Sequence, residues 1–179
     1  MEYISRQTTP QGHHIVQVGF FQAETPSIFA ACIPALGARY SHVELRFSDN
    51  TVTSITRDPG RVHYEEGRTL SNPKYRCFFQ IALAPQEEAC IQKIAQLYAN
   101  RAEATFSYFA MLWNFAPITR HWPVGGMFCS QYVTLLLQQV GLAADLQPAT
   151  TSPDDLFECL KHEKRAIASY NRCLFKLKA

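Results

Sequence analysis

Met127-Phe-Cys-Ser-Gln-Tyr-Val-Thr-Leu-Leu-Leu-Gln-Gln-Val-Gly-Leu142 places one cysteine at the start of an apolar helix, and we work outward from this segment. A turn-forming Trp-Pro-Val-Gly-Gly run at 122–126 precedes it. A helix is expected at 128–140. Helical spacing places its apolar residues on one face: Tyr132, Val133, Leu136, Leu137 and Val140. Gly141 is suited to cap its carboxyl end.

Cys129 is the candidate nucleophile. The first N–H groups of a helix have no partner within the helix, and the positive end of the helix dipole lies there. Such an environment lowers the pKa of a thiol and increases its thiolate fraction. The same N–H groups can bind an oxyanion that develops on a substrate. The sequence therefore predicts nucleophilic cysteine chemistry at Cys129.

A thiolate nucleophile needs a base, and the best candidate lies far upstream, in Tyr40-Ser-His-Val-Glu-Leu-Arg-Phe47. Apolar and polar residues alternate in this segment, which is typical of a half-buried strand; Val43, Leu45 and Phe47 form one face, and Tyr40, His42, Glu44 and Arg46 form the other. His42 is therefore expected on a rigid strand with a polar outlook. A lone histidine is more often solvated than catalytic, so the pairing with Cys129 is what makes His42 the candidate base.

Together these segments resemble the circularly permuted NlpC-type papain-like superfamily. The histidine strand precedes the cysteine helix, as in the permuted branch that includes bacterial amidase-like proteins, a poxvirus protein group and the lecithin retinol acyltransferase relatives. The resemblance covers roughly residues 15 to 142 and rests on short motifs. It implies that Cys129 is the nucleophile and His42 the base. It also implies a papain-like fold.

The residue that would orient His42 is open between Glu44 and Ser54. Many relatives carry an acidic residue on the strand after the histidine strand, but that strand here offers Ser54 or a neighbouring threonine. Glu44 lies two residues from His42 on the same face, about 6.5 to 7 Å along the strand, so it needs a favourable rotamer to reach the imidazole. A solvated ion pair with Arg46 or Arg39 is the alternative for Glu44.

Three further residues are candidates for substrate binding: Tyr108, Trp122 and Gln131. Tyr108 resembles an aromatic that lines the cleft in relatives, although a core aromatic is an equal alternative. Trp122 stands in the loop that runs into the cysteine helix, a candidate cleft wall, and Gln131 lies in the first turn of that helix.

The other five cysteines are interpreted as unreactive. Cys32 is expected at the end of a short helix and Cys159 beside a helix start rich in carboxylates, and both settings disfavour a thiolate. Cys77, Cys90 and Cys173 recur with apolar neighbours and are expected in the core.

Composition excludes several classes of protein. The formal charge of +2 is too small to indicate nucleic-acid binding. No signal region or membrane-spanning segment is evident, so we expect a reduced, cytoplasmic protein, in the host cell cytoplasm if it is viral, with contact at a membrane surface left open. No metal motif or phosphate-binding glycine loop is present, so no cofactor is expected, and His13-His14 is interpreted as an exposed dipeptide.

Periodicity predicts one α+β domain over 1–179, with an antiparallel sheet and the cysteine helix packed on it. The expected strands are 14–21, 40–48, 51–57, 75–84 and 169–178, and the expected helices are 26–33, 86–101, one within 104–114, 128–140 and 153–162. The strand at 75–84 is apolar on both faces and should be central.

The sequence favours a cysteine-dependent hydrolase or acyltransferase of the amidase or peptidase type. Its substrate would be a peptide, an isopeptide or an acyl lipid. The alternative is a catalytically inactive papain-like binding or structural module, viral or otherwise.

Overall fold

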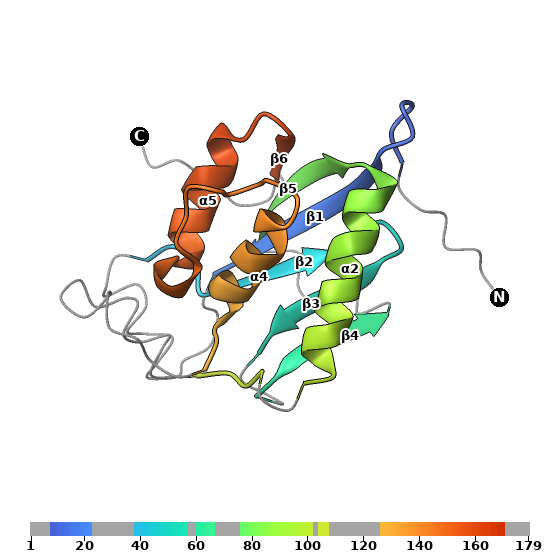
Figure 1. Cartoon of the computed structure of the whole chain (residues 1–179). Helices are drawn as coiled ribbons and strands as arrows, with labels where there is room; N and C mark the ends of the chain where they lie inside the picture. Colours follow the sequence, from blue (N-terminus) through green and yellow to red (C-terminus); the bar gives the residue numbers. More distant parts are fainter. Residues whose placement is uncertain are drawn as a thin grey trace, which may run out of the picture.

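The chain forms a single six-stranded sheet with helices packed on it (Figure 1). The structure is a computed structural model that describes residues 8–22, 38–56, 60–66, 76–101, 104–107 and 126–170. The strand order is β4-β3-β2-β1-β5-β6, and all neighbours pair antiparallel. The strands are β1 (His14–Phe21), β2 (His42–Arg46), β3 (Thr51–Ile55), β4 (Val62–Glu66), β5 (Arg76–Leu83) and β6 (Ala166–Tyr170). The expected α+β class and antiparallel sheet are confirmed.

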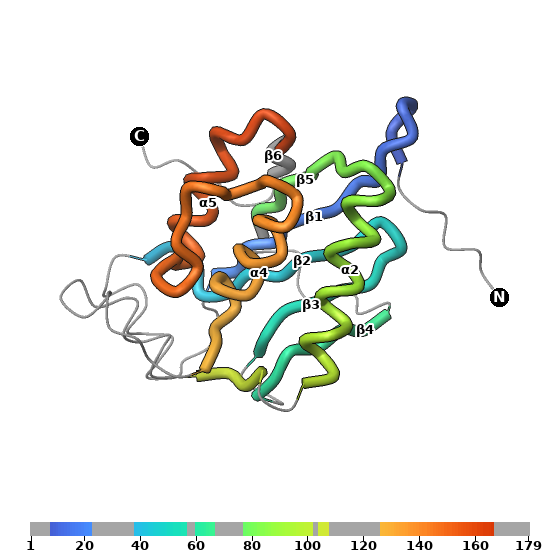
Figure 2. The backbone as a smooth tube through the Cα atoms, viewed as in Figure 1, coloured from blue at the N-terminus to red at the C-terminus, as the bar shows by residue number. Residues whose placement is uncertain are grey.

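Within the described residues, the α-helices α2 (Pro85–Ala99), α4 (Cys129–Gln138) and α5 (Pro153–His162) lie on the same face of the sheet, with α4 between the other two (Figures 1 and 2). A short 3-10 helix, η2 (Pro148–Thr150), precedes α5. Helix α4 packs on β2 and β3, as the sequence predicts for the cysteine helix. None of the helices in the described ranges is long and apolar enough to cross a membrane.

Local capping fixes where these helices begin and end. Helix α5 begins with a capping box, because the Ser152 hydroxyl accepts the Asp155 N–H at 3.1 Å and the Asp155 carboxylate accepts the Ser152 N–H at 2.9 Å. Helix α4 ends at Gln138 with Gln139 as its C-cap, so it is shorter than the expected 128–140. Gly141, predicted as the cap, lies two residues beyond Gln139; its φ of 73° suits glycine, and there the Leu142 N–H bonds the Leu137 carbonyl at 3.1 Å.

The core lies between the sheet and the helices. On β1, the fully buried Val18 stands opposite Leu45 of β2 and Phe79 of β5. Phe20 contacts the rings of Tyr40, Phe79 and Phe157 at centroid distances of 5.3, 5.9 and 5.4 Å. From α4, the predicted apolar face is buried: Tyr132, Val133, Leu136 and Leu137 have no exposed surface.

Three predictions about the sheet need correction. Strand β4 has no counterpart among the expected strands, because only Val62 and His63 are buried and the rest of the segment is polar. Strand β5 is interior but not central, since β1 and β2 occupy the middle positions. Tyr40 precedes β2 and is buried at 3% exposure against Phe157, so the alternation does not extend back to it.

The inner face of α2 was also predicted wrongly. Cys90 is exposed and Leu97 is 53% exposed, because the buried face consists of Glu88, Ile91 and Ala95. Glu88 is only 2% exposed, since its carboxylate accepts the Ser48 N–H at 2.6 Å and the Ser48 hydroxyl at 2.8 Å and also bonds His14. His14 is therefore not an exposed residue, as its side chain is 12% exposed.

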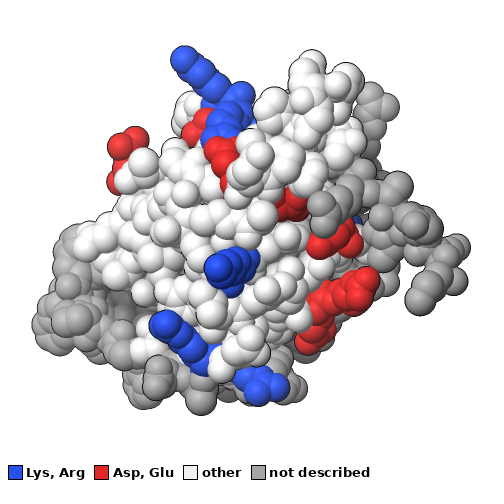
Figure 3. All heavy atoms as spheres, turned by 45° about the vertical axis from the view of Figure 1, so that its right-hand side comes forward, with Lys and Arg blue, Asp and Glu red and all other residues white. Residues whose placement is uncertain are grey.

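Other expected elements fall at the edge of the described residues. The helix expected within 104–114 is absent from 104–107, where Thr105 and Phe106 form β-bridges instead. The helix expected at 26–33 and residues 171–178 of the expected last strand lie outside the described residues. On the face that Figure 3 shows, acidic and basic side chains lie next to one another at the top, and the other charged side chains stand among broad uncharged areas.

Candidate active site

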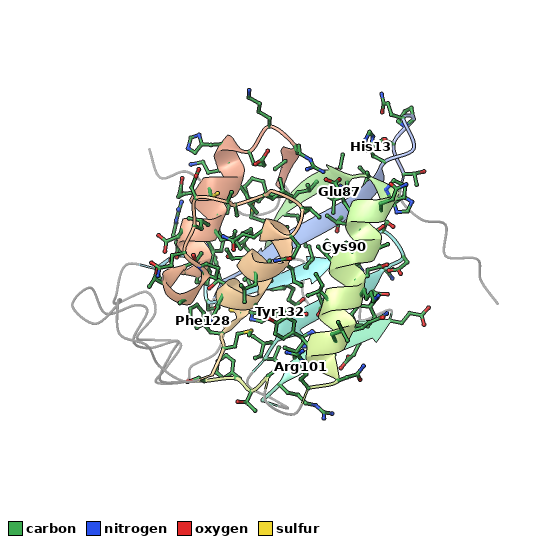
Figure 4. The ribbon with its side chains drawn as sticks, viewed as in Figure 1. His13, Glu87, Cys90, Arg101, Phe128 and Tyr132 are labelled. Carbon is green, nitrogen blue, oxygen red and sulfur yellow. The ribbon has the colours of Figure 1, made fainter. Side chains whose placement is uncertain are left out.

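Cys129 is the first residue of α4 and is 3% exposed. Phe128 precedes it in an extended conformation, with φ −130° and ψ 167°, and marks the start of the helix in Figure 4. The first backbone bond of the helix runs from the Tyr132 N–H to the Phe128 carbonyl at 3.0 Å. The N–H groups of Cys129, Ser130 and Gln131 therefore precede the intrahelical ladder and lie at the sulfur end of the helix.

The chain that leads into Cys129 is held by a short pairing with residues 105–107. The Met127 N–H bonds the Thr105 carbonyl at 3.0 Å, and the Ser107 N–H bonds the Met127 carbonyl at 2.9 Å. Gly126 has a φ of 91°, and a Cβ placed on it would lie 2.4 Å from the Ser107 Cβ. Only glycine fits at this close approach, so the approach of the chain to the nucleophile is fixed by its backbone.

We expect Gly126→Ala to destabilise the fold more than Gly141→Ala. Both glycines have positive φ, which costs a non-glycine residue about 1 to 2 kcal/mol, but only Gly126 would also clash with Ser107, since nothing lies within 4 Å of a Cβ on Gly141. The difference between the two free energies of unfolding, measured in urea, isolates the clash. Equal losses in the free energy of unfolding would show that Ser107 moves aside without an energetic penalty.

Tyr132 fixes α4 to the sheet one turn beyond the nucleophile (Figure 4). Its hydroxyl contacts the Thr53 Oγ1 of β3 at 2.8 Å, and Thr53 donates to the His63 carbonyl at 2.7 Å, so the Tyr132 hydroxyl is the donor. Burial raises the pKa of Tyr132, which keeps this hydroxyl protonated. The periodicity of the sequence places Tyr132 on the buried face but gives no sign of this bond.

His42 is the first residue of β2, and in Figure 1 the beginning of β2 reaches the beginning of α4. The predicted alternation holds from here: Val43 and Leu45 are fully buried, whereas His42 is half-buried, with a side chain that is 24% exposed. Phe21 is its partner across the strand pair, with ring centroids 5.6 Å apart. Because His42 and Cys129 each begin their element, they meet at one end of the strand.

The imidazole of His42 lies within interaction range of Cys129, which is the largest of the influences that raise the pKa of the ring. Burial disfavours a positive ring and lowers the pKa of His42. The negative charge of the Cys129 sulfur, the hydrogen bond with it and the hydrogen bond and charge of Glu44 outweigh burial and raise the pKa to about 10. An imidazolium therefore faces the sulfur at neutral pH.

Both candidates for the orienting residue reach the same nitrogen of His42. The Glu44 Oε1 lies 3.2 Å from Nε2, and the Ser54 Oγ lies 3.4 Å from it. Ser54 donates its proton to the Val43 carbonyl at 2.7 Å, so it can offer Nε2 only a lone pair. Glu44 is nearer and charged, and its side chain is 14% exposed. The geometry therefore favours Glu44 over Ser54.

Of the two alternative ion-pair partners of Glu44, Arg39 is bonded elsewhere, whereas Arg46 is affected by the charge of Glu44. Arg39 pairs with Asp154 and Glu158 on α5. Burial lowers the pKa of Arg46 and the charge of Glu44 raises it, so Glu44 acts on Arg46 through charge while it contacts His42 directly.

The candidate substrate-binding residues are less well placed. Gln131 is half-buried in the first turn of α4, and its Oε1 has no hydrogen-bond partner among the described residues. Tyr108 and Trp122 lie outside the described residues.

The other cysteines of the described ranges differ from Cys129. Burial raises the pKa of Cys77 to about 11. Burial, followed by the charges of Glu163 and Asp145, raises the pKa of Cys159. Cys90 is exposed on α2 (Figure 4). Cys32 and Cys173 lie outside the described residues.

Comparison with models of protein families, with curated proteins and with solved structures finds no match to this chain. Its chemistry is therefore inferred from the site alone.

Proposed function

We propose that this chain is a cysteine-dependent hydrolase or acyltransferase of the amidase or peptidase type. Cys129 is the nucleophile, His42 the general acid and base, and Glu44 the residue that orients His42. The observation that carries the proposal is the position of His42 between two groups: Cys129, which raises the pKa of the ring, and Glu44, whose Oε1 lies 3.2 Å from Nε2. Such a nucleophile, base and orienting group is the arrangement that covalent acyl transfer requires.

The reaction proceeds in two halves. The Cys129 thiolate attacks the carbonyl carbon of an amide, ester or thioester, and the N–H of Cys129 binds the oxyanion that forms. The His42 imidazolium gives its proton to the leaving amine, alcohol or thiol as that bond breaks, which leaves a thioester on Cys129. Neutral His42 then takes a proton from water or another acceptor, whose attack releases the acyl product and restores the thiolate.

We also propose that the fold is the permuted papain-like one. The order of the elements supports this, since the histidine strand β2 precedes the nucleophile helix α4 and α4 packs on β2 and β3 within an antiparallel sheet. The acidic residue stands on the histidine strand itself, as Glu44, whereas β3 presents Ser54.

Acyloxymethyl ketone probes test the proposed chemistry, one built on a short peptide and one on a fatty acyl chain. We expect one of them to form an adduct on Cys129, detected by mass mapping of peptides, and no adduct at this position in Cys129→Ala. The probe that labels identifies the substrate as peptide-like or lipid-like. Absence of labelling by both would contradict the proposal.

A binding module without catalysis is the second candidate, and the burial of the nucleophile favours it. Cys129 is 3% exposed, so a carbonyl reaches the sulfur only if its surroundings open. In that case neither probe would label Cys129, and His42 would serve the structure alone.

A further inference from the structure

One segment at the start of α5 is bonded to both halves of the candidate active site. On the nucleophile side, the Ser130 hydroxyl donates to the Thr151 carbonyl at 2.7 Å. Ser130 directly follows Cys129 and has no exposed surface. Because this bond is buried, it fixes the position of the first turn of α4 relative to the segment 151–154.

On the histidine side, the same segment holds the chain that leads into β2. The Asp154 Oδ2 accepts the backbone N–H of Arg39 at 3.0 Å and that of Tyr40 at 3.3 Å. Its Oδ1 accepts the Arg39 Nε at 3.1 Å. The ring of Tyr40 also packs on Phe157 of α5, with centroids 4.8 Å apart. Residues 39–40 are thus attached to α5 two residues before His42.

The segment itself is well fixed. The Thr151 hydroxyl donates to the Gln147 carbonyl at 2.7 Å, and the Ser152–Asp155 capping box closes the first turn of α5. Thr151 is 2% exposed and Ser152 is 9% exposed. A buried, hydrogen-bonded segment that contacts both elements can help to set the distance between them.

We propose that the segment 151–154 sets the separation of the Cys129 sulfur and the His42 ring, with Ser130 and Asp154 as positioning residues. The proposal rests on the proposed function and adds which residues set the geometry of the candidate active site. Reacting groups must be placed to within a fraction of an ångström, and a shift of about 1 Å can cost on the order of 100-fold in rate. The bonds of Ser130 and Asp154 therefore act on the chemistry without contact with the substrate.

Three variants separate positioning from general stability on the histidine side. Asp154→Ala removes the acceptor of both backbone N–H groups, and Asp154→Asn keeps an acceptor oxygen without the charge. Glu158→Gln leaves both N–H bonds in place and weakens the other ion pair of Arg39 together with the pair of Glu158 and Lys161. The measurement is the rate of Cys129 alkylation by iodoacetamide against pH, together with the melting temperature. We expect Asp154→Ala to slow alkylation at pH 6 about fivefold and to move the rise of the rate with pH to higher pH, and the other two variants to stay within about twofold of the parent.

The nucleophile side provides an independent arm. Ser130→Ala should slow the alkylation of Cys129 to a similar extent. In the double variant with Asp154→Ala, the alkylation rate should fall by less than the product of the two single reductions, because both residues act through one segment. Parental alkylation rates and pH profiles in Asp154→Ala and Ser130→Ala would overturn the proposal, as would losses that follow the melting temperature in all variants. If His42→Ala also alkylates like the parent, the proposed function itself fails, which distinguishes the two outcomes.

Discussion

At pH 6, iodoacetamide should alkylate Cys129 at least about tenfold faster than any other thiol of the folded protein, and His42→Ala should remove this preference. An ordinary thiol is only about 0.3% ionised at pH 6, because its pKa lies near 8.5. The His42 ring interacts with Cys129, the first residue of α4, and a cationic neighbour at a helix N-terminus is the typical setting of a reactive thiol. A short pulse on the native protein, followed by mass mapping of peptides, gives the rate at each cysteine.

The chain supplies its own controls for this experiment. Cys90 is exposed, so it reports how fast an accessible thiol reacts under the same conditions. Cys77 is buried and its pKa is raised to about 11, so it should remain unlabelled until the protein unfolds. Labelling of Cys90 and Cys129 at equal rates, or a rate at Cys129 that is the same in His42→Ala, would leave the site without demonstrated chemistry.

The two central residues could be predicted from sequence because local signals identify them. A cysteine between a turn and an apolar helix is visible as a break in periodicity, and α4 begins at Cys129 as that pattern predicts. Strict alternation around His42 likewise predicts β2, whose two apolar residues are fully buried. What no local pattern contains is the contact between them, which comes from the packing of α4 on β2.

The errors arise where side-chain contacts override local preference. A glutamate in a helix normally marks the solvent face, yet Glu88 is buried because Ser48 and His14 satisfy its carboxylate. The burial of Glu88 sets which face of α2 lies on the sheet and leaves Cys90 on the exposed face. The rotamer of Glu44 is a similar case, because spacing along a strand shows only that the carboxylate can reach His42, whereas the structure shows that it does.

If Cys129 and His42 catalyse acyl transfer as proposed, replacing Glu44 by Gln should reduce turnover of an acyl substrate by a factor on the order of 100 to 10,000, while Ser54→Ala should change it by less than about threefold. An orienting carboxylate stabilises the imidazolium, and loss of its charge in a catalytic triad costs up to about 10,000-fold. Ser54 lies farther from Nε2 and has its proton committed to the Val43 carbonyl. Similar turnover in Glu44→Gln and the parent would remove Glu44 from the mechanism, and a large loss in Ser54→Ala would assign the role to Ser54.

The pH dependence of the same variant gives a second, independent readout. The pKa of His42 is raised from 6.5 to about 10, so its proton is present at neutral pH and is lost as the pH rises through about 10. Removing the charge of Glu44 takes away one of the causes of this increase, so the pKa must fall, and the basic limb of the activity profile must move to lower pH. The titration of the His42 ring can be followed by NMR, with its resonance identified by its absence in His42→Ala. If the ring titrates at the same pH in Glu44→Gln and the parent, the 3.2 Å contact between Glu44 and Nε2 does not affect the pKa of His42 in solution. A lower pKa of His42 without loss of turnover would show that the charge of Glu44 acts on the ring but is not needed for catalysis.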